Sequence, residues 1–125
     1  MPQSQTALED LDFSKVNMPR ETDQKILLRF LEGAFVALYR YNDDSDAEIL
    51  PTRQDLYQYG GGYAWGYNGS GPANLSHAIA AKVFEFDNLE KPELQARAYA
   101  ILDQLVSKLA EEKEHDLSFS LIRAV

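Results

Sequence analysis

One short stretch of the chain collects the residue types that could bind a small ligand. Residues 60–72 hold six of the seven glycines and the only tryptophan. Tyr63, Trp65 and Tyr67 stand at alternate positions, so an extended backbone would place their rings on one side. Aromatic rings arranged in this way can stack on a planar ligand. The pattern predicts an aromatic strand that ends in a Gly-Ser-Gly turn, with left-handed backbone at Gly69 or Gly71.

A helix is expected to begin directly after this turn. Pro72 suits a first helical turn, where its missing N–H costs nothing. Unpaired amides at such a helix start, together with the helix dipole, favour an anion or a phosphate. Arginines elsewhere in the chain could add a charged hydrogen bond to that phosphate. The candidate ligand-binding set is therefore Arg53, Tyr63, Trp65, Tyr67, Asn68, Gly69, Ser70, Gly71, Asn74 and Arg123.

The same glycines could instead permit a tight turn packed under Trp65, and the sequence leaves both interpretations open. The turn lacks the Gly-Lys-Ser/Thr of nucleotide hydrolases and the dinucleotide-binding fingerprint. His77 and His115 are the only histidines, and neither has a second ligand at metal-binding spacing. A triad from Ser70 and His77 lacks a nucleophile elbow. We therefore expect no catalytic residue, no metal and no cofactor.

Composition narrows the partners. The 125 residues carry a net charge of −8, which disfavours binding to duplex DNA and would suit a basic protein partner. No run of 18 apolar residues exists, so we expect no membrane span. The absence of cysteine favours a cytoplasmic protein. An exposed sheet edge or N-terminal arm would make a homo-oligomer plausible.

The pattern of apolar residues divides the chain into an N-terminal arm, residues 1–20, and a single domain, residues 21–125. Residues 25–41 alternate as a hairpin with a turn at Glu32-Gly33, although an amphipathic helix also fits them. An acidic turn at 42–46 precedes a short edge strand, which Pro51 ends. Helical spacing predicts helices over 72–86 and 91–114, and alternation predicts a last strand over 116–125.

These elements predict an α+β fold. The N-terminal hairpin and the C-terminal strand would form a small antiparallel sheet, and the two helices would pack on one face of it. The two helical stripes are apolar enough to need such a surface.

Two runs carry a resemblance to a known family. The first is Leu-Pro-x-Arg-x-Asp-Leu over residues 50–56, and the second is Trp-Gly-Tyr-x-Gly-Ser-Gly-Pro-Ala-x-Leu over residues 65–75. With the closing Leu-x-Phe-x-Leu-Ile-Arg run, they resemble a small uncharacterised domain family of bacteria, plasmids and phages across roughly residues 25–125. The family has no known function, so the resemblance implies no catalytic residue.

Small acidic phage proteins with a phosphate-binding corner suggest, by analogy, a counter-defence role. The hypothesis is non-enzymatic binding or sequestration of a small phosphorylated, nucleotide-like immune signal in the host cytoplasm. The alternative is an acidic inhibitor that blocks a basic nucleic-acid-binding partner, such as a CRISPR or other defence complex. A third interpretation is an enzyme that acts on a nucleotide.

Overall fold

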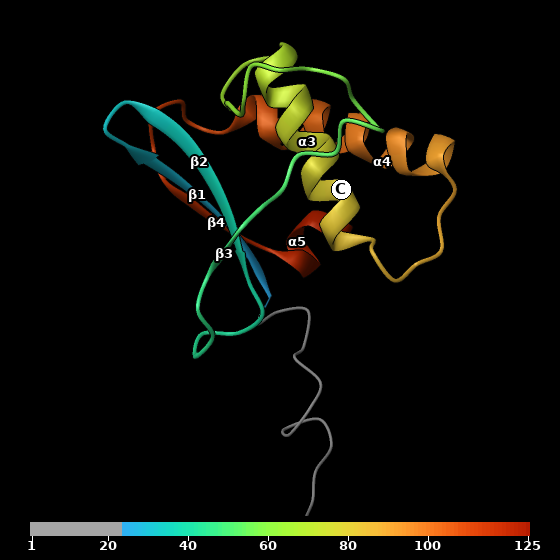
Figure 1. Cartoon of the computed structure of the whole chain (residues 1–125), viewed down its shortest axis with the longest axis horizontal. Coiled ribbons are helices and arrows are strands. Elements are labelled where there is room, and N and C mark those ends of the chain that lie inside the picture. The colour runs from blue at the N-terminus through green and yellow to red at the C-terminus, as the bar shows by residue number, and fades with distance from the viewer. Residues whose placement is uncertain (1–23) are drawn as a thin grey trace, which may run out of the picture.

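The computed structural model describes residues 24–125, which form one four-stranded antiparallel sheet beside a group of helices (Figure 1). The expected arm, residues 1–20, lies outside this range. The strand order is β3-β2-β1-β4, and each neighbouring pair is antiparallel. The strands are β1 (Lys25–Leu31), β2 (Ala34–Arg40), β3 (Glu48–Ile49) and β4 (His115–Ser118).

The hairpin prediction is confirmed, and the helical alternative for residues 25–41 is excluded. Strands β1 and β2 pair from Lys25–Arg40 to Leu31–Ala34. Glu32 and Gly33 have φ angles of 52° and 80°, so both residues of the tight turn lie in the left-handed region. Two such residues match the twist of the flanking strands, which makes this turn suitable for a two-residue hairpin.

The last ten residues differ from the expected strand. Strand β4 pairs with β1, as predicted, but ends at Ser118. The chain then forms the short helix α5 (Phe119–Arg123), and the Ser118 hydroxyl accepts a hydrogen bond from the Leu121 amide. A serine that caps a helix in this way competes with continued strand pairing. Phe119 and Ile122, three positions apart, are the residues of α5 that become buried.

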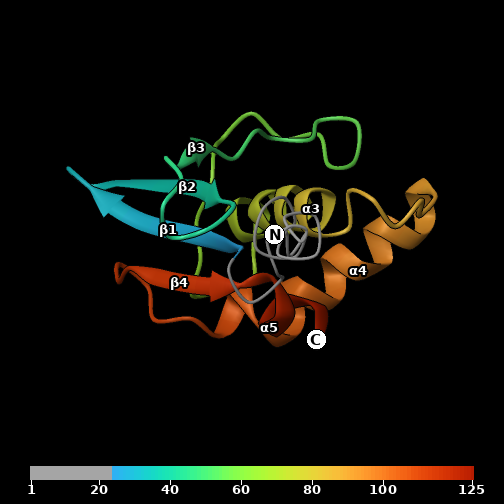
Figure 2. The same ribbon diagram turned by 90° about the horizontal axis from the view of Figure 1, so that it is seen from below.

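Both predicted helices are present, and each ends earlier than predicted. Helix α3 (Ser70–Val83) and helix α4 (Lys91–Gln104) lie to one side of the sheet (Figure 2). A capping box between Glu90 and Glu93 fixes the start of α4. Its end comes ten residues before the predicted boundary at 114, because the chain turns at Leu105 into the 3-10 helix η1 (Val106–Lys108). No helix within residues 24–125 has the length and apolar character needed to cross a bilayer.

Helix α3 lies at the centre of the core. Twelve of its 14 residues are buried, from Gly71 to Ala81 and at Val83. The core joins the sheet to both helices through Ile26, Leu28, Leu75, Ile79, Ala98 and Ile101. A helix that is buried on nearly all sides needs other parts of the protein to pack against each of those sides. The sheet, helix α4 and the long connection from residue 50 to residue 69 provide that cover.

The glycines of this connection use left-handed backbone at positions other than the expected ones. Gly69 is extended, with φ −173°, and Gly71 lies inside α3. The positive φ angles belong instead to Gly62 and Gly66, at 90° and 96°. The Gly66 amide donates to the Val106 carbonyl at 3.0 Å, so this turn fixes the connection to η1. The connection contains no strand, which corrects the predicted aromatic strand.

Gly66→Ala should destabilise the fold by roughly 1–3 kcal/mol, because a side chain at this φ is strained. The added Cβ would also lie 2.7 Å from the Glu111 Cβ and 2.9 Å from its Cα. The matched control is Gly60→Ala, where a Cβ meets no atom within 4 Å. Urea unfolding measures both changes. Equal midpoints for the two variants would contradict the described turn.

Candidate functional site

Trp65 is part of the core. Its side chain is 0% exposed, and the indole Nε1–H donates to the Lys113 carbonyl at 3.1 Å. The ring meets Phe35 edge-on, with 4.7 Å between the ring centres. The indole therefore has no face left for a ligand, and in this structure it serves the packing role that the sequence left open.

The other two expected rings do not form one stacking surface with Trp65. Tyr63 is half-buried and its hydroxyl donates to the Leu50 carbonyl at 2.8 Å, while burial raises the pKa of that hydroxyl above its ordinary value. Tyr67 is 44% exposed and lies over Gly69, where an added Cβ would come within 2.8 Å of its ring. At Gly71 a Cβ would lie 2.9 Å from the Ala64 Cβ. Both glycines are thus explained by close packing.

The start of α3 lacks a side-chain cap, as the anion-site hypothesis requires. Asn68 and Ser70 are exposed there, and the Ser70 hydroxyl accepts from the Tyr57 hydroxyl at 3.3 Å. Asn74, by contrast, is 1% exposed and its Nδ2 donates to the Gly62 carbonyl at 2.9 Å. Asn74 is therefore held against the glycine-rich connection and does not point to solvent.

The two expected arginines line different cavities. Arg53 lines the larger one, and its Nε and Nη2 donate to the Asp55 carboxylate at 2.9 and 2.8 Å. Arg123 lines the smaller one and holds Asp87 through two bonds of 2.8 Å. The bond from Arg123 holds the pKa of Asp87 below its usual range. The structure does not bring the two guanidinium groups to one site.

The larger cavity measures about 400 Å³ and lies between the segment after β3, the second half of α3 and the start of α4. Its charged and polar groups come from Arg53, Lys82, Glu85 and Asn88, and its apolar walls include Leu50, Ala78, Ala81, Phe84, Leu89 and Leu94. Of the ten residues expected from the sequence, only Arg53 lines it. Lys82, Glu85 and Asn88 belong to no local motif, so no sequence signal could have identified them.

Lys82 has the least exposed of the charged side chains that line this cavity. Its side chain is 17% exposed, and Nζ lies 3.5 Å from Glu85 Oε1 and 4.1 Å from the centre of the Tyr39 ring. Lys82 and Glu85 also line the smaller cavity, of about 180 Å³, which extends to Tyr41, Phe86 and Arg123. An ammonium held by a ring face and one carboxylate retains capacity to donate to a third group.

A buried histidine, His77, directly precedes the lining residue Ala78 on α3. His77 is 1% exposed, with Nδ1 2.7 Å from the Ala73 carbonyl. Tyr57 stacks on its ring and Tyr99 meets it edge-on, each with 4.9 Å between centres. Within the described part of the chain, His77 Nε2 and Asn74 Oδ1 are buried without a hydrogen-bond partner. Burial lowers the pKa of His77 below its ordinary value.

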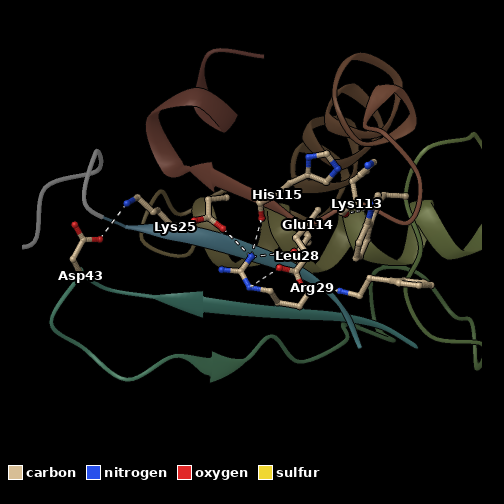
Figure 3. A network of polar contacts seen from close by, with 10 residues as sticks. Lys25, Leu28, Arg29, Asp43, Lys113, Glu114 and His115 are labelled. Carbon is tan, nitrogen blue, oxygen red and sulfur yellow. Dashed lines mark hydrogen bonds and ion pairs between the residues drawn. The ribbon is translucent and has the colours of Figure 1, made fainter. Parts of the chain in front are cut away.

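Ion pairs on the sheet surface link β1 to β4 and to the segment after β2 (Figure 3). Their residues line neither cavity. Arg29 Nη1 donates to Asp116 at 2.8 Å, and its Nε lies 4.0 Å from Glu114. Lys25 pairs with Asp43 at 3.1 Å. These carboxylate partners are more than half exposed, so the ion pairs contribute little to stability. Between residues 24 and 125, no three His, Asp or Glu side chains are placed to hold a metal ion.

Comparison with known proteins places the chain in a family. Residues 29–124 match the model of a family described as a family of unknown function, DUF6166, so the protein belongs to that family. Neither the curated proteins nor the solved structures provide a match. The match supports the uncharacterised domain expected from the sequence.

Trp65→Ala should cost roughly 3–5 kcal/mol of unfolding free energy, because it empties a buried site and leaves the Lys113 carbonyl without its donor. Tyr67→Ala is the control and should cost less, since that ring is 44% exposed. Chemical unfolding monitored by far-ultraviolet circular dichroism measures both. A Trp65→Ala loss below about 1 kcal/mol would contradict the core role of the indole.

The stability of the protein should fall as the pH drops below about 6.5. His77 has its folded pKa lowered from 6.5, so the unfolded chain binds the proton first. The His77 contribution is complete above pH 6.5 and is lost as the pH falls toward the folded pKa, at no more than about 1.4 kcal/mol per pH unit. Urea midpoints between about pH 7.5 and 5.5 measure this slope. An unchanged slope in a folded His77→Phe variant would contradict the assignment.

Proposed function

We propose that the protein binds a small phosphorylated, nucleotide-like ligand, without turning it over, in the 400 Å³ cavity beside the second half of α3. The observation that carries the proposal is the presence of both Arg53 and Lys82 in the lining of a cavity with apolar walls. The geometry favours this cavity over the glycine-rich corner, because the rings expected there are engaged in packing.

Charge supports an anionic ligand. The whole chain has a net charge of −8, yet the lining of this cavity has two cations and one carboxylate. The Arg53–Asp55 pair uses Nε and Nη2. Nη1 of Arg53 donates to no acceptor among residues 24–125, so it remains available to a phosphate oxygen. A planar guanidinium and a compact ammonium are the usual protein ligands of phosphate.

Size and polarity support a nucleoside attached to that phosphate. Cavities of about 300–1,000 Å³ bind drug-sized molecules, usually through apolar walls with few polar groups. Leu50, Phe84 and Leu94 provide apolar surface here, and the Asn88 side chain adds an amide. Inorganic phosphate alone would leave these walls without a partner.

Sequestration of a nucleotide immune signal in the host cytoplasm is the role that we assign to this binding. It depends on the resemblance of residues 65–75 to a signature of bacterial, plasmid and phage proteins. A protein that removes a signal needs affinity and abundance, and no reaction chemistry. A homodimer would carry two such binding sites.

Titration calorimetry with AMP, cyclic nucleotides and ADP-ribose tests the proposal. Arg53→Gln and Lys82→Gln should each weaken binding about tenfold or more, because each removes a charged hydrogen bond. Glu85→Gln should tighten binding, because it removes the one carboxylate that lines the cavity. Lys108→Gln is the matched control, since Lys108 is exposed on η1 and lines neither cavity.

Two outcomes would reject the proposal. Absence of binding to every nucleotide would favour the acidic inhibitor of a basic partner. Binding that is equal in Arg53→Gln, Lys82→Gln and Lys108→Gln would place the ligand outside the cavity. If chromatography shows that a bound nucleotide is converted to a product, the sequestering role is wrong and the protein is an enzyme.

A further inference from the structure

Two buried polar side chains lie beside the cavity lining, toward the start of α3. Asn74 and His77 each stand four positions before a lining alanine, Ala78 and Ala81. Residues four apart share a helix face, and side chains lean toward the helix start. The amide of Asn74 and the imidazole of His77 therefore share a face of α3 with the two lining alanines, and both lie buried next to the cavity lining but outside it.

Two tyrosine rings, one from the connection before α3 and one from α4, pack on the imidazole of His77. Tyr57 follows the lining Arg53 by four positions, in a turn closed by a 3.0 Å bond from the Tyr57 amide to the Arg53 carbonyl. Tyr99 follows the lining Leu94 by five positions on α4. Both tyrosine rings contact His77, so they form a closure over the imidazole.

Neighbouring groups determine whether the two unpartnered atoms, His77 Nε2 and Asn74 Oδ1, are hydrogen-bond donors or acceptors. The Ala73 carbonyl only accepts, so His77 Nδ1 must carry the hydrogen and the neutral ring leaves a lone pair on Nε2. The Gly62 carbonyl likewise requires Asn74 Nδ2 as its donor, which leaves Oδ1 as an acceptor. Both atoms are therefore acceptors, and only an N–H or O–H donor can satisfy them.

We propose that Asn74 and His77 form a donor-selecting subsite that recognises the exocyclic amino group of a nucleobase. This subsite rests on the proposed function and adds the ligand class, which is a nucleotide with an amino-bearing base. A fully ionised phosphate has no donor and gains nothing from the two acceptors. Arg53 and Lys82 would hold the phosphate, and the acceptor pair would select the base.

Tyr57 is the part of the closure that has to move. It is only half-buried, and its hydroxyl is held by a single long bond of 3.3 Å to Ser70. Its ring stacks on the imidazole at an angle of 22° between planes. A nucleobase that displaced this ring would take over the stacking contact and bring its amino group to the acceptors.

The test compares AMP with purine riboside 5′-monophosphate, which lacks only the amino group, and with ribose 5-phosphate. The wild-type protein should bind AMP about tenfold or more tightly than either analogue, because only AMP satisfies the buried acceptors. His77→Phe keeps an aromatic ring but removes one of the two acceptors, so it should lose most of the preference for AMP over purine riboside monophosphate. His115→Phe is the control and should keep the preference, since His115 Nε2 is already bound to the Ala110 carbonyl.

A second measurement on the wild-type protein covers the case in which His77→Phe fails to fold. The ¹⁵N signal of His77 Nε2 should shift on addition of AMP and stay unchanged with ribose 5-phosphate. Equal affinity for AMP and purine riboside monophosphate, both tighter than ribose 5-phosphate and still dependent on Arg53, would overturn this inference and leave the proposed function intact. Absence of binding by all three compounds would reject the proposed function itself.

Discussion

The structure depends on the burial of helix α3. Twelve of its 14 residues are buried, so its polar side chains must find partners inside the protein. The Ser76 hydroxyl donates to the Pro72 carbonyl at 2.8 Å, and the Nδ1–H of His77 donates to the Ala73 carbonyl at 2.7 Å. A single sheet cannot cover such a helix. Helix α4 and the connection over residues 50–69 are therefore as necessary to the fold as the strands.

This requirement explains both the glycine-rich corner and the cavity. The connection must pass close to α3, so small residues at Gly66, Gly69 and Gly71 stand where other side chains approach. Trp65 packs against Phe35 of the sheet and donates to the Lys113 carbonyl in the segment before β4. Near the end of α3 the small Ala78 and Ala81 leave a hollow, and the charges of Arg53 and Lys82 border it. The cavity is thus the place where the cover of α3 is incomplete.

Local patterns predicted the elements whose residues signal their own structure. The turn at Glu32-Gly33 fixed the hairpin, and the stripe of Leu94, Ala98 and Ile101 indicated α4. The prediction of the final strand was partly wrong, because a short alternation of apolar residues fits either a strand or a capped helix. The site was harder to predict, since Arg53, Lys82 and Asn88 come together only through tertiary packing. Alternating aromatic residues also cannot show that one of them, Trp65, will be buried.

The most direct test of the account is a chemical-shift map of the ¹⁵N-labelled protein titrated with AMP. Binding beside the second half of α3 predicts changes at the Arg53 side chain and at the amides of Ala78, Ala81, Lys82 and Asn88, with little change at Ser70 and Gly71. Changes confined to Asn68–Gly71, or no saturable change at any residue, would contradict the account.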